Sequence, residues 1–131
     1  DIGGGVFASG TFKMSGQAVI RSCTAESATQ FVCGGGVYVN GSSSFEMSDT
    51  AIIEGCQAIS TPSSPSKGGG VHLANNTKFT LSGSAVIQNC TATNSANPGE
   101  AYGGGVSAAC VKEITLADSA RIVGCTAANG S

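Results

Sequence analysis

The sequence predicts an all-β protein, a right-handed parallel β-helix built from about four coils of 31–35 residues with three short strands per coil. Three observations support this fold. A glycine motif recurs at nearly constant spacing, apolar positions keep their register between the copies, and apolar and polar residues alternate within each copy. Coils of this kind fold by stacking, because a single coil cannot bury its own apolar face.

The recurring motif is Gly-Gly-Gly-Val, which begins at Gly3, Gly34, Gly68 and Gly103, so successive copies are 31, 34 and 35 residues apart. Glycine supplies the positive φ angles that tight corners need. We therefore expect a coil to start near each copy. Residues 1–131 form one β-helix segment in this interpretation, which we expect to belong to a longer repeat array or to an assembly.

Alternation within the second coil predicts its three strands. Residues 37–39, 45–47 and 51–53 each place two side chains on one face and the side chain between them on the other. Helical repeats of similar period need apolar residues at i, i+3, i+4 and i+7, which this pattern lacks. Right-handedness follows from the general rule for parallel crossovers.

Four positions match between all coils and are expected to form the core. Equivalent residues of stacked coils lie about 4.8 Å apart, so like side chains form columns. The columns are Phe12/Phe45/Phe79/Ile114, Ala18/Ala51/Ala85/Ala120, Ile20/Ile53/Ile87/Ile122 and Cys23/Cys56/Cys90/Cys125.

Two outward positions support the same register. Lys13 should lie beside Glu46 of the next coil, and Arg21 beside Glu54. Opposite charges on neighbouring strands are mildly stabilising, by about 0.2–1 kcal/mol per pair.

Two motifs of the chain also suggest a family. Residues 3–6 read Gly-Gly-Gly-Val and residues 20–25 read Ile-Arg-Ser-Cys-Thr-Ala, and both have copies in the later coils. They resemble the Gly-Gly-Ala-Ile and Phe-x-x-Asn repeats, the latter often followed by Thr-Ala, of chlamydial polymorphic outer membrane proteins and related bacterial and protozoan surface β-helix proteins. The resemblance extends over the whole chain. It implies a secreted or surface-displayed passenger segment, often adhesive.

Four of the six cysteines form one column, Cys23, Cys56, Cys90 and Cys125. We expect buried thiols that act as small apolar side chains. Paired disulfides such as Cys23–Cys56 and Cys90–Cys125 are the alternative, because neighbouring coils place Cα atoms within disulfide range. A metal site is not expected, since a column spread over about 14 Å cannot converge on one ion.

The charged residues do not predict an active site. Carboxylates do not recur on neighbouring coils, and Asp49 and Asp118 share a register only two coils apart, with Gly83 between them. Hydrolysis of glycosides needs two converging carboxyl groups. The only histidine, His72, is expected on the surface. We predict no enzymatic activity and no cofactor.

Charge and hydropathy exclude two classes of partner. Only 11% of residues are charged and the net charge is −2, so no basic stripe for nucleic acid is present. No window approaches the roughly 18 apolar residues of a membrane span. Self-association through the coil ends, or contact with neighbouring coils of a parent chain, is expected instead.

Candidate binding residues lie in the segments that vary most between coils, residues 26–33, 59–67 and 93–102. Insertions along one edge of a solenoid often form its binding face, and unselected loops are the alternative. A host surface protein or a glycan is the expected ligand class. The candidates are Ser60, Thr61, Pro62, Pro65, Asn94, Asn97, Pro98 and Glu100.

The leading functional hypothesis is a non-enzymatic, extracellular or cell-surface β-helical module of the passenger or adhesin type. The alternative is a filament subunit that stacks end to end through open strand edges. A fragment of a polysaccharide lyase or hydrolase is the third possibility.

Overall fold

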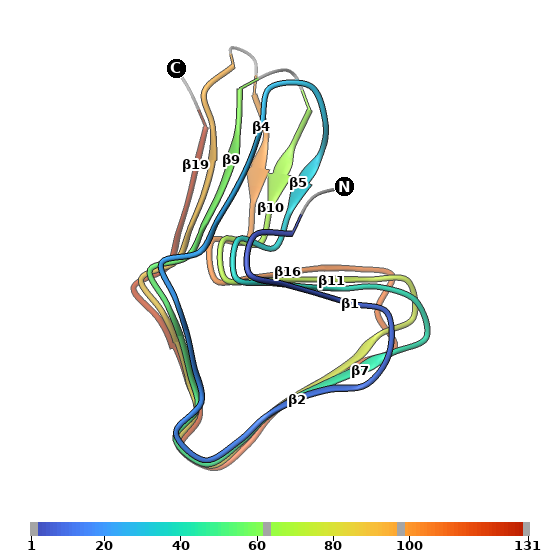
Figure 1. Cartoon of the computed structure of the whole chain (residues 1–131), viewed down its shortest axis with the longest axis vertical. Helices are drawn as coiled ribbons and strands as arrows, with labels where there is room; N and C mark the ends of the chain where they lie inside the picture. The colour runs from blue at the N-terminus through green and yellow to red at the C-terminus, as the bar shows by residue number, and fades with distance from the viewer. Residues whose placement is uncertain (1–2, 62–63, 97–98, 130–131) are drawn as a thin grey trace.

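The computed structural model describes residues 3–61, 64–96 and 99–129. Within them the chain is all-β and forms a parallel β-solenoid of about four coils, as predicted. Viewed along the stacking axis, the coils overlie one another (Figure 1). No helix long and apolar enough to cross a membrane occurs in these residues.

Each coil contributes four or five short strands. The first coil contains β1 (Val6–Ala8), β2 (Phe12–Met14), β3 (Val19–Arg21), β4 (Thr24–Ser27) and β5 (Val32–Cys33). The second contains β6 (Val37–Val39), β7 (Ser44–Met47), β8 (Ile52–Glu54), β9 (Gln57–Ser60) and β10 (Ser66–Lys67). The third contains β11 (Val71–Ala74), β12 (Lys78–Leu81), β13 (Val86–Gln88), β14 (Thr91–Asn94) and β15 (Ala101–Tyr102). The fourth contains β16 (Val106–Ala109), β17 (Glu113–Leu116), β18 (Arg121–Val123) and β19 (Thr126–Asn129).

Three of the parallel sheets enclose a triangular core, which we call the triangle. Their strand orders are β1-β6-β11-β16, β17-β12-β7-β2 and β18-β13-β8-β3. The remaining sheets, β19-β14-β9-β4 and β15-β10-β5, lie against each other and project from one corner of the triangle (Figure 1). We call this projection the fin.

The fin is the main difference from the sequence prediction. The three predicted strands per coil are those of the triangle, whereas the added strands of the fin include described residues of the segments expected to be variable loops. Its interior is lined by small residues, including Ala25, Ala58 and Val32, all nearly inaccessible to solvent. Small side chains let the two sheets approach closely, so the segment forms strands without the large apolar residues of an ordinary core.

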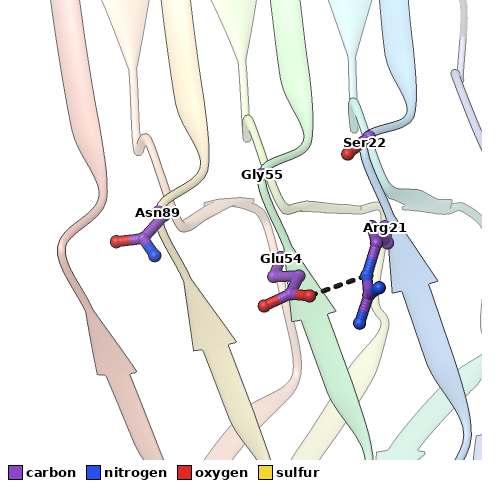
Figure 2. A pocket seen from close by; sticks show the side chains of 5 residues that line it. All are labelled: Arg21, Ser22, Glu54, Gly55 and Asn89. Atoms are coloured by element: carbon purple, nitrogen blue, oxygen red, sulfur yellow. Dashed lines mark ion pairs between the residues drawn. The ribbon is translucent and has the colours of Figure 1, made fainter.

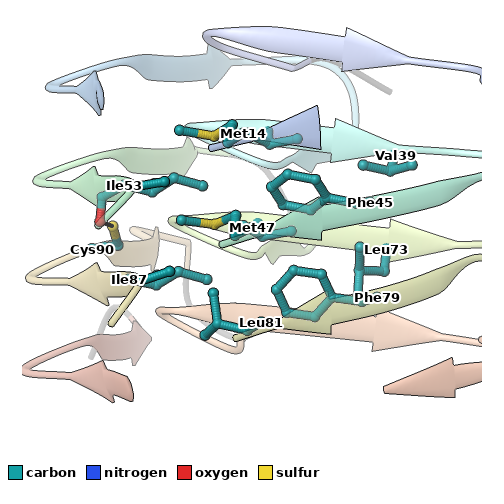
Figure 3. Packing of buried hydrophobic residues seen from close by; sticks show 14 of the residues in the cluster. Met14, Val39, Phe45, Met47, Ile53, Leu73, Phe79, Leu81, Ile87 and Cys90 are labelled. Atoms are coloured by element: carbon teal, nitrogen blue, oxygen red, sulfur yellow. Dashed lines mark hydrogen bonds between the residues drawn. The ribbon is translucent and has the colours of Figure 1, made fainter. Parts of the chain in front are cut away.

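The predicted columns fill the triangle. Phe12 pairs with Phe45, Phe45 with Phe79 and Phe79 with Ile114 along the stack. The rings of Phe45 and Phe79 are stacked with their centroids 5.1 Å apart. Figure 3 shows this column beside the buried methionine, leucine and isoleucine side chains. Burial of such side chains provides about 1.5–3 kcal/mol each, which makes the triangle the main source of stability.

The outward charges confirm the register. The Lys13 ammonium lies 2.9 Å from the Glu46 carboxylate, and Arg21 lies 2.7 Å from Glu54. The backbone pairing agrees, with Lys13 opposite Glu46 and Arg21 opposite Glu54.

The last coil leaves the columns open at one end. Ile114, Leu116 and Ile122 continue inward-facing columns, yet they are 49%, 56% and 42% exposed because no described coil covers them. Their equivalents in the third coil, Phe79, Leu81 and Ile87, are at most 1% exposed.

Candidate functional site

The tip of the fin holds the residues predicted to bind a ligand. Ser60 and Asn94 are fully buried there. The Ser60 hydroxyl donates to the Ser64 carbonyl at 2.7 Å. The Asn94 amide donates to the carbonyls of Ser64 and Glu100, and its Oδ1 accepts from the backbone N–H of Ala96 at 2.9 Å. Both side chains therefore stabilise the backbone at the tip through hydrogen bonds.

A polar column runs along the inside of the fin at this level. In the first coil, the Ser27 hydroxyl accepts from the backbone N–H of Thr29 and of Gln30. In the last coil, Asn129 Oδ1 accepts from the N–H of Ala101 at 2.7 Å. The column consists of Ser27, Ser60, Asn94 and Asn129. Ser27, Ser60 and Asn94 are buried and satisfy backbone groups where the chain turns back, because buried polar groups need partners. Asn129 is exposed on the last coil and bonds the first residue of β15.

The other predicted binding residues differ in how far their side chains are exposed to solvent. Thr61 and Glu100 are exposed at the tip, and Pro65 is half-buried. These side chains are available to a ligand, and a role in binding stays a prediction for them. The remaining candidates, Pro62, Asn97 and Pro98, lie outside the described residues.

The four-cysteine column lies where β3-type strands bend into β4-type strands. All six cysteines of the chain fall in its described part, and all are free thiols in the structure. Each column thiol donates to the carbonyl two residues earlier, as Cys90 does to Gln88 at 3.3 Å. A column of thiols, rather than paired disulfides, stays a prediction for the protein in solution.

Burial and contact between neighbours shape the acidity of these thiols. Contact with the Cys56 thiol, together with desolvation, raises the pKa of Cys90. The same contact is the main cause that lowers the pKa of Cys56. Desolvation is the main cause that raises the pKa of Cys23. Cys56 and Cys90 are fully buried, so a reagent in solution reaches neither thiol, whatever the direction of its pKa shift.

A groove runs in the corner between the fin and the outer face of β6 and β11, with a volume of about 230 Å³. On its floor the ring of Tyr38 contacts Phe7 on one side and His72 on the other, with centroids 5.2 and 5.4 Å apart. On its fin side the Lys67 ammonium lies 5.6 Å from the centroid of Phe31. The groove is lined by Phe31, Cys33, Tyr38, Lys67, His72, Ala74, Asn75 and Ala109.

The surface position predicted for His72 is wrong. His72 points out of the triangle but is only 3% exposed, because the fin covers this corner. Desolvation, and then the nearby charge of Lys67, lower the pKa of His72 to about 4. Its Nδ1 is buried without a hydrogen-bond partner.

A second hollow, of about 280 Å³, lies on the outer face where the chain bends after β3, β8 and β13 (Figure 2). Its charged groups, Arg21 and Glu54, are paired with each other, and Glu54 also accepts from the Gln88 amide at 2.8 Å. The remaining lining residues are Ser22, Gly55 and Asn89.

The other carboxylates in register also serve the backbone. Asp49 Oδ2 accepts from the N–H of Gly16 at 2.8 Å, and Asp118 Oδ2 accepts from the N–H of Gly83 at 2.9 Å. Among residues 3–61, 64–96 and 99–129, no three histidine, cysteine, aspartate or glutamate side chains are grouped so that they could hold a metal ion.

No protein-family model matches the chain. The chain likewise matches none of the curated proteins and none of the solved structures with which it was compared.

Proposed function

We propose that this chain is a non-enzymatic structural module of the passenger or adhesin type, displayed outside the cell or at its surface. It is a rigid stack of coils that carries the tip of the fin away from the solenoid axis. Its resemblance to bacterial and protozoan surface β-helix repeats supports the location.

One observation carries the proposal: the residues that recur in every coil are engaged in stacking, and the variation is concentrated at the tip of the fin. The apolar columns fill the triangle, and the polar column from Ser27 to Asn129, which is buried except for Asn129, stabilises the turns of the tip. Exposed side chains at the tip, among them Thr61 and Glu100, differ between coils and would contact a host protein or a glycan.

Binding to a glycan array and to host cells tests this function. The wild-type chain should bind, and the variants Thr61→Lys and Glu100→Lys should bind more weakly. The matched control Gln17→Lys changes an exposed residue on the bend of the triangle between β2 and β3, outside the fin, and should bind like the wild type. Absence of binding to every ligand would overturn the adhesive role, and equal loss in all three variants would overturn the assignment to the tip.

The uncovered face of the fourth coil favours a second candidate function, that of a subunit that assembles end to end. Ile114, Leu116 and Ile122 are large apolar side chains that are about half exposed on the last coil. Open strand edges with apolar side chains favour pairing with another chain. Sedimentation velocity over a wide range of concentrations tests it, and a monomer at every concentration would overturn it.

A further inference from the structure

The coils alternate in pairs rather than repeating singly. At the bend after β2, β7, β12 and β17, all four coils place a residue in the left-handed region, with φ of 61°, 58°, 65° and 58°. The first and third coils have glycine there, and the second and fourth have aspartate. The four residues are Gly16, Asp49, Gly83 and Asp118.

Contacts with the preceding coil, made by both aspartates, and with the following coil, observed for Asp49, explain this alternation. Asp49 and Asp118 each accept, through Oδ2, the backbone N–H of the glycine in the coil before. The coil after an aspartate has no room for a side chain, since a Cβ on Gly83 would lie 2.8 Å from the backbone nitrogen of Asp49. The same space beside Gly16 is open: among the described residues, no atom beyond its chain neighbours lies within 4 Å of a Cβ placed there.

A second column alternates in the opposite phase. Ser22, Gly55, Asn89 and Gly124 follow one another along the stack, all with positive φ. Here the coils with a side chain are the first and third. A Cβ on Gly124 would lie 2.5 Å from Oδ1 of Asn89, and a Cβ on Gly55 would lie 3.8 Å from the Ser22 hydroxyl. Figure 2 shows Ser22, Gly55 and Asn89 in succession.

The ion pairs also repeat with a period of two coils. Within the described residues, Lys13–Glu46 and Arg21–Glu54 join the first coil to the second, and Lys78–Glu113 joins the third to the fourth at 3.7 Å. The cation comes from the odd coil and the anion from the even coil in each case. Between the second and third coils, Gln88 donates to Glu54 instead.

We propose that the open end of the fourth coil takes the first coil of a second copy of this chain, head to tail and in the register that joins the second coil to the third. The proposal rests on the self-assembly candidate above and specifies its partner surface. In this junction Asp118 lies against Gly16 of the second copy, as Asp49 lies against Gly83. Gly124 is then followed by Ser22, as Gly55 is followed by Asn89.

The apolar columns and the charges also continue across this junction. Ile114, Leu116 and Ile122 would be covered by Phe12, Met14 and Ile20 of the second copy, which occupy the same columns. At this junction, no outward position among the described strand residues places two like charges directly opposite each other. If the fourth coils of two copies met each other instead, neither the glycine–aspartate column nor the Ser22–Gly124 column would keep its alternation across the junction. A head-to-tail contact of this kind does not close on itself, so it adds copies along one axis.

Gly16→Asn tests the proposed contact. Asparagine is tolerated in the left-handed region, and the space beside Gly16 is open in a single chain, so the variant should fold with nearly unchanged thermal stability. In the stack, its Cβ would meet the backbone of Asp118, and association should weaken by at least about tenfold. Sedimentation velocity and electron microscopy of wild type and variant measure this.

A pair of substitutions at Val123 tests the register. Val123 is exposed, lies opposite Gln88 in its own chain and would lie opposite Arg21 of the second copy. Val123→Glu should strengthen association about two- to fivefold at low salt, and Val123→Lys should weaken it by a similar factor. Each variant is the matched control for the other, because both replace the same apolar side chain with a charged one.

The results of these experiments distinguish self-assembly in general from the specific head-to-tail junction. A wild-type chain that stays monomeric overturns self-assembly and this junction together. A closed dimer, or filaments that form equally well with Gly16→Asn, keeps self-assembly and overturns the head-to-tail junction. Filaments that are lost with Gly16→Asn and respond with opposite sign to the two Val123 charges support the junction.

Discussion

Gly70 lies directly against the thiol of Cys90: a Cβ placed on Gly70 would stand 3.2 Å from the cysteine sulfur. The same relationship holds between Gly36 and Cys56, also at 3.2 Å. The third glycine of each Gly-Gly-Gly-Val motif thus makes the space that the cysteine column fills. Two features that are separate in the sequence, the glycine run and the cysteine, form one packing unit in the fold.

Gly70→Ala should destabilise the protein strongly. Its Cβ would lie 2.6 Å from the carbonyl oxygen of Gly105 and 2.9 Å from Cγ2 of Ile87, and backbone cannot move aside as a flexible side chain can. We expect a loss of about 1–3 kcal/mol in the free energy of unfolding, measured by urea denaturation. The matched control is Gly10→Ala, where no atom of the described residues beyond the chain neighbours lies within 4 Å of the new Cβ. A similar loss in both variants would contradict this packing argument.

Native-state alkylation should follow the burial of the thiols. Cys110 is exposed and should react first, Cys23 and Cys125 at the ends of the column more slowly, and Cys33, Cys56 and Cys90 only after unfolding. Mass spectrometry counts the labelled cysteines. Six labels on the unfolded, unreduced protein are expected, and four or fewer would show that disulfides had formed.

The sequence was sufficient to predict the triangle because its columns consist of large apolar residues in strict alternation. Phe45 and Ile53, for example, recur in register and are fully buried. The ion pairs of Lys13 and Arg21 were predictable for the same reason, since register alone places opposite charges side by side.

The fin could not be predicted from apolar pattern alone. Its added strands include pairs of residues such as Val32–Cys33 and Ser66–Lys67, too short to show alternation. Its inner face carries alanine and buried polar residues, which resemble loop composition. One signal is present in the sequence: Ala25 and Ser27 are buried and alternate with exposed residues, and the equivalent positions of β9 and β14 are also buried. The burial of His72 was missed because it depends on the fin.

Stability should decrease in acid because of His72. Its pKa is about 4 in the folded protein, against an ordinary value of 6.5 for a solvated histidine, so the unfolded chain takes up a proton first as the pH falls. The contribution of the neutral imidazole is fully present above pH 6.5 and is lost as the pH falls toward 4. The loss amounts to at most about 1.4 kcal/mol per pH unit in this window.

Urea denaturation at several pH values, compared with His72→Phe, isolates this effect. Phenylalanine keeps an aromatic ring beside Tyr38 but does not titrate, so the stability of the variant should depend less on pH between 6.5 and 4. Parallel curves for the two proteins would show that the imidazole is protonated as easily in the fold as in the unfolded chain.

Asn94→Ala should loosen the tip of the fin. The substitution removes the donor to the carbonyls of Ser64 and Glu100 and the acceptor for the N–H of Ala96, all at a fully buried position. Loss of buried hydrogen-bond partners costs about 1–3 kcal/mol. The Ala96 N–H is left without its acceptor, so its hydrogen exchange should accelerate more than that of amides in the triangle.

The matched control for Asn94 is its neighbour Thr93, which is only partly buried and lies opposite Ile59 and Ala128 on the stack. Thr93→Ala should change the free energy of unfolding by less than about 0.5 kcal/mol. If the two variants lost equal stability, or if exchange at Ala96 did not change in Asn94→Ala, the polar column would not be what fastens the tip. Because the proposed binding residues Thr61 and Glu100 stand on these same turns, Asn94→Ala should also weaken binding of any ligand that contacts them.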